Sequence, residues 1–378
     1  MESIERRPTR VVRIGSVPIG GNHPIAVQTM TTTRTEDIDA TLAEIRELEE
    51  AGAEMIRVAV PFEKSAKALV EIKKAMRVPL IADIHFDSRM ALLAIEAGVD
   101  KIRLNPGNIG QRKRVERVVA MAKERGVPMR IGVNSGSVEK EFLEKYGSPT
   151  PEAMVDSAAK HVALLEELGF EDIVVSLKST DTLAAVRAYR LASARLPYPL
   201  HLGITEAGKP GYGEIKSAAG IGSLLLDGIG DTIRVSLSGP SRLEVEAGFA
   251  ILKATGRRVT EPEVVACPTC GRIEIDMLPL VAEVEAFART LGPRPVRISV
   301  LGCPVNGPGE AREADIGLAG GRGMGFLYRR GVQVRKVPEG EMLAALKEEV
   351  LRFLEEEGGT AGSPASAGRA AEDRGGLR

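Results

Sequence analysis

Short runs of β-branched and other apolar residues recur along the first two thirds of this chain, and a helical pattern follows each run. The eight runs are Ile25 to Thr29, Met55 to Ala59, Leu80 to Asp83, Lys101 to Leu104, Met129 to Val133, Ile173 to Leu177, Leu200 to Ile204 and Thr232 to Leu237. The segments between them place apolar residues three or four positions apart, which is typical of amphipathic helices. Eight such units predict α/β architecture, a closed (β/α)₈ TIM barrel. An open doubly wound sheet is the alternative, but no Gly-x-Gly-x-x-Gly turn follows the first run.

A second, smaller domain is expected after the barrel. At 378 residues the chain is long for one domain. The polar stretch with breakers after Thr255 is typical of a linker. We therefore predict a barrel over 1–255, a linker over 256–263 and a small α+β domain over 264–357. The Gly/Ser/Ala-rich remainder, 358–378, has too little apolar content to fold and is predicted to be disordered.

Composition excludes several classes of protein. Lys and Arg number 51 against 52 Asp and Glu, Trp is absent and aromatic residues are only 3%, which argues against a nucleic-acid-binding protein. No window reaches the length of a membrane span, and the charged start lacks the apolar core of a secretory signal. We expect a soluble protein that is not exported.

The only three cysteines, Cys267, Cys270 and Cys303, all lie in the last third of the chain. Three cysteines in a chain this long do not make a disulfide framework, so a reducing cytoplasm is expected. A Cys-x-x-Cys pair and a third cysteine on a Gly/Pro-rich loop indicate a metal centre. No histidine follows Cys270, which disfavours zinc held by three cysteines and a local histidine.

The remaining candidate for this centre is an iron-sulfur cluster in which one iron is left to a carboxylate, solvent or substrate. Glu310 is the nearest carboxylate on the Cys303 loop. A redox dithiol or a pair of buried thiols is the alternative for Cys267 and Cys270.

Polar residues interrupt or close the predicted strands, where TIM barrels carry their chemistry. They are Arg57, Asp83, His85, Arg103, Asn105, Arg130, Asn134, Lys178, His201, Glu206, Arg234 and Ser236. So many cations around one mouth predict a pocket for a phosphorylated ligand. A single strand-end arginine often only pairs with a helix carboxylate, and a single buried histidine is usually a hydrogen-bonded core residue. Glu206 lies in a glycine-rich loop, where it suits proton transfer or is simply an exposed carboxylate.

Several motifs, in order from about Thr9 to about Gly325, resemble those of the 4-hydroxy-3-methylbut-2-enyl diphosphate synthase (IspG/GcpE) family of the non-mevalonate (MEP) isoprenoid pathway. They are Val27 to Thr31, Ala82 to Phe86, Arg103 to Gly110, Arg130 to Asn134, His201 to Gly208, Gly230 to Ser236, Ala266 to Cys270 and Asn306 to Glu310. The short connection after Thr255 resembles the two-domain form of the family.

The resemblance implies a TIM barrel followed by a small α+β iron-sulfur domain like that of sulfite and nitrite reductases. It also implies reductive ring opening of 2-C-methyl-D-erythritol 2,4-cyclodiphosphate by two electrons. A [4Fe-4S] cluster would pass these electrons on from reduced flavodoxin or ferredoxin. Residue by residue, it implies cluster ligands at Cys267, Cys270, Cys303 and Glu310, and an acid/base candidate at Glu206. The implied substrate-binding residues are Arg57, Arg103, Arg130, Asn134, Lys178 and Ser236. Asn105 and His201, with Asp83 and His85, orient the substrate or only support the pocket.

The connection between the domains predicts a head-to-tail homodimer. The chain leaves the eighth barrel helix at the end opposite the mouth, and a linker of about nine residues spans at most about 30 Å. A partner chain would therefore place its cluster domain over each mouth. Two other functions stay open from the residues alone: an iron-sulfur carrier or sensor with the barrel as scaffold, and a phosphosugar lyase with a structural zinc site.

Overall fold

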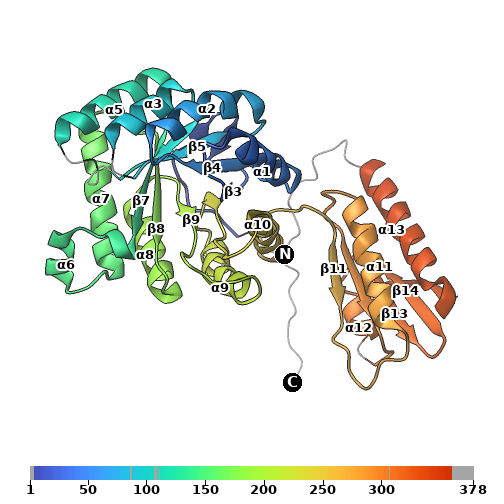
Figure 1. The fold of residues 1–378 in the computed structure, drawn as a ribbon. Coiled ribbons are helices and arrows are strands. Elements are labelled where there is room, and N and C mark those ends of the chain that lie inside the picture. Colours follow the sequence, from blue (N-terminus) through green and yellow to red (C-terminus); the bar gives the residue numbers. More distant parts are fainter. Residues whose placement is uncertain (1–3, 86, 106–108, 110, 306, 360–378) are drawn as a thin grey trace, which may run out of the picture. The chain divides into compact units, whose positions relative to one another are not determined.

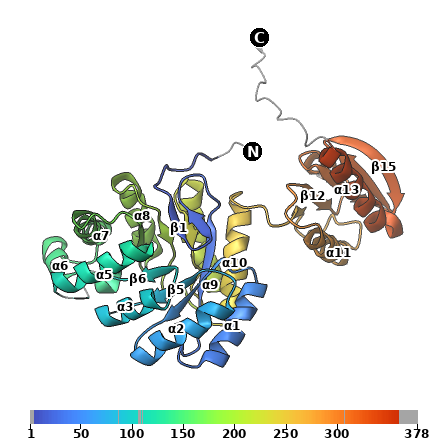
Figure 2. The ribbon, with the colours of Figure 1, turned by 90° about the horizontal axis from the view of Figure 1, so that it is seen from above.

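The computed structural model describes residues 4–85, 87–105, 109, 111–305 and 307–359, and the chain divides into two compact units, Met1–Arg258 and Val259–Arg378 (Figures 1 and 2). The last helix extends to Gly359, and the rest of the tail predicted from residue 358 lies outside the described residues.

An eight-stranded parallel sheet forms the centre of the first unit, in the order β8-β7-β6-β5-β4-β3-β10-β9. A parallel bridge between Val175 and Leu200 joins its two outer strands, so the sheet is nearly closed on itself. The predicted TIM barrel is confirmed. Its strands are β3 (Ala26–Met30), β4 (Met55–Ala59), β5 (Leu80–Asp83), β6 (Lys101–Arg103), β7 (Met129–Asn134), β8 (Ile173–Lys178), β9 (His201–Leu202) and β10 (Thr232–Ile233).

A ring of helices surrounds these strands, as Figure 1 shows. They are α1 (Ile38–Glu50), α2 (Glu63–Ala75), α3 (Ser88–Glu96), α5 (Arg112–Arg125), α7 (Pro151–Glu167), α8 (Thr182–Arg195), α9 (Tyr212–Leu226) and α10 (Ser241–Ala254), with a short extra helix, α6 (Lys140–Tyr146). Four of these helices begin at a capping residue whose side chain accepts a hydrogen bond from a backbone N–H of the first turn. The capping residues are Asp37, Asp87, Thr150 and Asp181. The helices bury one apolar face each against the strands.

A hairpin that the sequence did not predict closes the amino-terminal end of the barrel. Its strands are β1 (Val12–Ile14) and β2 (Val17–Ile19), which pair antiparallel. Val12, Ile14 and Ile19 pack against Ala26, Met55, Ile81 and Val174 from the interior of the barrel, and all seven side chains are buried. Ala26 and Met55 begin their strands, so this apolar plug lies at the end opposite the strand carboxyl termini.

The second unit is a five-stranded mixed sheet in the order β11-β12-β13-β14-β15. The strands are β11 (Glu263–Ala266), β12 (Arg297–Leu301), β13 (Ile316–Gly321), β14 (Met324–Arg329) and β15 (Val332–Pro338), of which the first three run parallel. Helices α11 (Met277–Thr290) and α13 (Met342–Gly359) bury an apolar core with the sheet. Leu301, Ala311, Ala319 and Tyr328 form a separate cluster with the short helix α12 (Gly307–Ala311).

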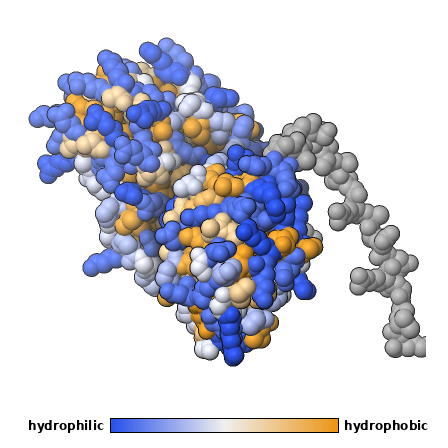
Figure 3. Space-filling view, turned by 90° about the vertical axis from the view of Figure 1, so that its right-hand side faces the viewer, coloured by the Kyte–Doolittle hydropathy of each residue, from blue (hydrophilic) through white to orange (hydrophobic). Residues whose placement is uncertain are grey.

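On the face seen in Figure 3, hydrophobic residues reach the surface in patches among hydrophilic ones. Within the described part of the chain, no helix has both the length and the apolar character that crossing a membrane requires.

Candidate active site and cysteine centre

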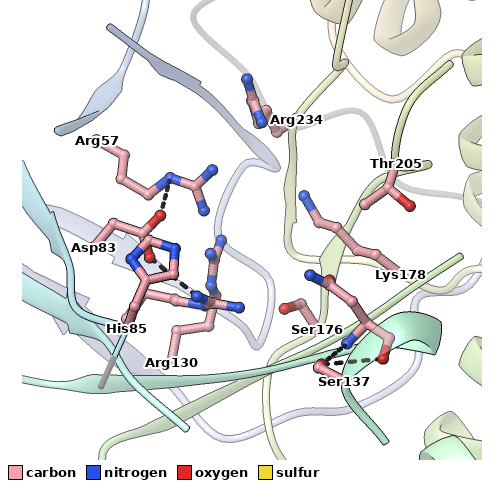
Figure 4. Close-up of a pocket in the computed structure, with 11 residues that line it drawn as sticks. Arg57, Asp83, His85, Arg130, Ser137, Ser176, Lys178, Thr205 and Arg234 are labelled. Atoms are coloured by element: carbon pink, nitrogen blue, oxygen red, sulfur yellow. Dashed lines mark hydrogen bonds and ion pairs between the residues drawn. The ribbon is translucent and has the colours of Figure 1, made fainter. Parts of the chain in front are cut away.

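A cavity of about 340 Å³ opens at the carboxyl-terminal ends of the barrel strands (Figure 4). The lining residues come from seven strands or the loops that follow them: Arg57, Asp83, His85, Arg103, Arg130, Asn134, Ser137, Ser176, Lys178, Thr205 and Arg234. Four arginines and a lysine thus face a single lining carboxylate. A pocket with this charge balance favours an anionic ligand.

Asp83, at the end of β5, is the carboxylate that holds two of these arginines in place. Its Oδ2 lies 3.7 Å from Nε of Arg57, and its Oδ1 lies 3.3 Å from Nη1 of Arg103. Burial alone would raise the pKa of Asp83, but Arg57 and Arg103 outweigh burial and lower it to about 2. Burial lowers the pKa of Arg57 to about 10 although Asp83 opposes the shift. Asp83 and Arg57 therefore both carry charge at neutral pH.

Arg130 and Lys178 are buried in the pocket wall, and neither forms an ion pair with a carboxylate among the described residues. Arg130 is only 2% exposed, and its Nε and Nη1 have no hydrogen-bond acceptor among the described residues. No ion pair of Lys178 occurs in the described structure, and the pKa of its ammonium is lowered by burial and by Arg130, Arg234, Arg57 and Arg103. A buried donor without an acceptor lowers the stability of the fold. Such donors are typical of a binding site whose acceptors belong to the ligand.

Arg234 reaches the mouth from the loop after β10 and is held by a carboxylate from outside the pocket. Glu244, 3% exposed in the first turn of α10, accepts from Nε of Arg234 at 3.3 Å and from Nη2 at 3.2 Å. The same carboxylate also accepts from the Thr29 hydroxyl and the Leu237 backbone N–H. Glu244 therefore fixes the direction of Arg234.

Several residues predicted for the site do not line the cavity. Asn105 is buried, and its Oδ1 accepts from the backbone N–H of Gly132 at 3.1 Å. His201 is fully buried, and its Nδ1 lies 2.7 Å from the Thr232 hydroxyl. Ser236 is half-buried in the loop after β10, and Glu206 is exposed with a left-handed φ of 51°.

Three lining residues were not among the residues predicted from the sequence: Ser137, Ser176 and Thr205. Ser176 stands two positions before Lys178 on β8, and alternation along a strand would have placed both on one face. Ser137 caps the turn after β7, where its hydroxyl bonds to the backbone of Asn134. Thr205 directly precedes Glu206.

In the second unit, two of the three cysteines follow the ends of neighbouring parallel strands. Cys267 comes directly after β11 and Cys303 follows β12. The Gly302 backbone N–H donates to Sγ of Cys267 at 3.3 Å, and Sδ of Met277 lies 3.4 Å from the same sulfur. None of the three thiols is in a disulfide, and Cys270 is exposed while Cys303 is buried.

Arg272 is electrostatically linked to all three sulfurs. Hydrogen bonds from the backbone and the side chain of Arg272 lower the pKa of the Cys270 thiol. In turn Cys270, Cys303 and Cys267 raise the pKa of Arg272. Glu310 lies in α12, which packs against β12 and β13. Among the described side chains, no three of His, Cys, Asp and Glu converge closely enough to hold a single metal ion.

Comparison with known proteins identifies both units. Residues 9–249 match the GcpE TIM-barrel domain, and residues 263–352 match the GcpE protein C-terminal domain. A 4-hydroxy-3-methylbut-2-en-1-yl diphosphate synthase (flavodoxin) of Geobacillus thermodenitrificans is 56% identical over 355 residues, which are 94% of this chain and 95% of that protein. The protein of the same name from Anoxybacillus flavithermus is 55% identical over 94% of this chain and 97% of its own length.

Among solved structures, a dihydropteroate synthase of Yersinia pestis is similar at 13% identity and a TM-score of 0.47, over 65% of this chain and 98% of that one, which is too weak a likeness to bear on function. The two domain matches and the identity to the relatives decide the matter: the chain belongs to the GcpE family, that of the 4-hydroxy-3-methylbut-2-en-1-yl diphosphate synthases.

Proposed function

We propose that this chain converts 2-C-methyl-D-erythritol 2,4-cyclodiphosphate to 4-hydroxy-3-methylbut-2-enyl diphosphate in the non-mevalonate pathway. The observation that carries the proposal is the barrel pocket, in which Arg130 and Lys178 are buried without an anionic partner among the described residues. The reaction breaks the ring carbon–oxygen bond to phosphate and expels a neighbouring hydroxyl as water. It consumes two electrons and a proton, and the product carries one more negative charge than the substrate.

The cations at the mouth bind the diphosphate in this proposal. Arg130 and Lys178 donate directly to its oxygens, and Arg57, Arg103 and Arg234 surround it with directions that Asp83 and Glu244 fix. Guanidinium groups match phosphate oxygens in pairs, whereas the lysine acts as a point charge. Asn134, the last residue of β7, and Ser236, in the loop after β10, lie at the same end of the barrel and supply neutral donors.

The roles of the remaining predicted residues follow from their positions. Asn105 is already engaged with the Gly132 N–H, so it shapes the wall that Arg103 and Arg130 share. His201, buried beside Thr232, supports the pocket from the barrel interior. Glu206 directly follows Thr205 of the lining, and we assign it the proton that the departing hydroxyl needs.

Cys267, Cys270, Cys303 and Glu310 are the proposed ligands of a [4Fe-4S] cluster. The donor set fits this group: three thiols outside any disulfide, a backbone N–H that donates to one sulfur, and a guanidinium that favours thiolate at Cys270. When bound, such a cluster supplies the electrons and one iron open to exchange with a substrate oxygen. Thiol ligands also agree with a reducing cytoplasm as the place of action.

Reduced flavodoxin is the proposed electron donor, because the names of both relatives specify it, and ferredoxin is the alternative. A head-to-tail homodimer is proposed as well. Helix α10 ends at Ala254 and β11 begins at Glu263, so the connection is shorter than about 30 Å even when fully extended. Helix α10 is itself about 21 Å long, so a chain that retraced it would have only about 9 Å left with which to cross the mouth.

Anaerobic purification with measurement of iron, sulfide, zinc and visible absorption tests the proposal first. We expect about four irons and four sulfides per chain, broad brown absorption, and turnover of the cyclodiphosphate only with a reductant. Removal of the iron with a chelator should abolish turnover. Zinc in place of iron, with activity that needs no reductant, would instead favour the phosphosugar lyase.

A further inference from the structure

A second set of basic groups lies inside the barrel, beneath the pocket. Arg103 lines the mouth, and Lys101 stands two positions earlier on the same strand, so both point into the barrel and Lys101 lies one layer deeper. Lys101 is fully buried. Its Nζ has one hydrogen bond in the described structure, to Oε1 of Gln28 at 3.3 Å.

Within the described part of the barrel, the charged groups that act on Lys101 are basic. Arg130 on β7 and Arg57 on β4 both disfavour a charge on Lys101, and burial disfavours it still more, so its pKa lies well below the usual value for lysine. His201 on β9 faces the same interior, and burial, Arg130, Lys178 and Lys101 lower its pKa in turn. No ion pair of Lys101 with a carboxylate occurs among the described residues.

Only some of these bases are able to give up their proton. A guanidinium holds its proton far more tightly than an ammonium or an imidazole, so the lysines and the histidine lose theirs before any arginine does. The mutual repulsion in the empty barrel can be relieved only at the lysines and at His201. A diphosphate held by Arg130 and Lys178 reverses the field at this point, because its negative charge attracts a proton to the nearest vacant base.

We propose that Lys101 is a further residue of substrate binding, uncharged in the empty barrel and protonated when a diphosphate occupies the mouth. Lys101 does not touch the ligand. It takes up a proton from solvent and balances, from beneath, the negative charge that the pocket has received. This inference rests on the proposed function, since it takes the pocket to be the diphosphate site.

Calorimetric titration measures this proton directly. The full-length protein with its cluster is titrated with the cyclodiphosphate, without oxygen or reductant, in buffers that differ in ionisation enthalpy, from pH 7 to 9. The wild-type protein should take up protons, and its affinity should fall by about tenfold per pH unit for each proton bound. Lys101→Met should take up about one proton fewer than the wild type, with a flatter pH dependence of affinity. Lys74→Met, at an exposed lysine in the last turn of α2, is the matched control and should behave as wild type.

Two more variants separate the possible acceptors. Lys178→Met removes the lysine of the pocket wall, so any uptake that remains above the range of histidine reports Lys101. Uptake in Lys101→Met equal to that of the wild type, or a loss confined to His201→Gln, would overturn the inference. So would wild-type binding with no uptake, which leaves the proposed function intact. Absence of any binding of the cyclodiphosphate would overturn both together.

Discussion

Glu206 is the one predicted catalytic residue whose backbone is itself unusual. Its φ of 51° lies in the left-handed region, which is energetically unfavourable for a residue with a Cβ. Glycine would occupy this position at lower cost, and glycines with positive φ stand nearby at Gly208 and Gly211. A strained glutamate next to the pocket residue Thr205 is therefore an outlier that suggests a function for its side chain.

We expect Glu206→Gln to lower turnover of the cyclodiphosphate by about 100-fold or more, since general acid catalysis contributes at least that much. The affinity for the substrate should change little, because the arginines that hold the diphosphate stay in place. Steady-state kinetics and calorimetric binding measure the two effects separately. Lys209→Gln, an exposed charge in the same loop, is the control. Unchanged turnover in Glu206→Gln would show that the proton comes from elsewhere.

The strand-end cations show which part of the site follows from sequence. Arg57, Arg103, Arg130 and Lys178 were predicted because they interrupt or close apolar runs, and all four line the cavity. The pair of Arg234 with Glu244 was not predicted, because it depends on how the start of α10 packs beside β3 and β10. Nor does sequence alone tell that Asn105 is occupied by a backbone N–H, a contact that exists only once β6 and β7 are neighbours.

At the scale of elements, α12 owes its position to a glycine on the neighbouring strand. A Cβ on Gly317 of β13 would lie 2.6 Å from the backbone oxygen of Ala311 and 2.9 Å from its Cα. The short helix that carries Glu310 can pack this closely only against a strand without a side chain there. The distance between Glu310 and the cysteine loops therefore depends on Gly317.

Gly317→Ala should push α12 away from the sheet and weaken the hold on the cluster. We expect a loss of about 1–3 kcal/mol in the free energy of unfolding, the usual cost of overpacking. The iron content, the sulfide content and the brown absorption after anaerobic purification should all fall together. Gly340→Ala, where a new Cβ meets open space in the same unit, is the control. Full iron content in a destabilised Gly317→Ala would mean that the position of α12 does not matter to the cluster.

Strands that form an uninterrupted apolar run were predicted well, and shorter or glycine-rich ones were missed. Strands β4 and β5 have the predicted bounds, Met55–Ala59 and Leu80–Asp83. The hairpin strands β1 and β2 have only three residues each, too few for a period to show. Strand β13 ends in Gly320 and Gly321, which signal a turn, but Ile275 and α12 crowd its two faces and require small residues.

At the scale of the whole molecule, the proposed dimer predicts that two defective chains can complement each other. Arg130→Met disables the barrel, and Cys270→Ser disables the cluster domain. A heterodimer of the two variants, isolated by separate tags, pairs one intact barrel with one intact cluster domain across the interface, so about half of the wild-type activity is expected. Each variant alone should be nearly inactive. An inactive heterodimer, or a monomer with full activity at high dilution, would refute the head-to-tail arrangement.

The hairpin that fills the lower end of the barrel makes the site a cup with one opening. Val12, Ile14 and Ile19 seal the floor with apolar side chains, and the polar interior lies above them. Substrate, product, water and protons must all use the same rim. Each turnover of the proposed reaction therefore requires the product to leave before the next substrate molecule enters. The product, with its added negative charge, must pass the same arginines that attract the substrate.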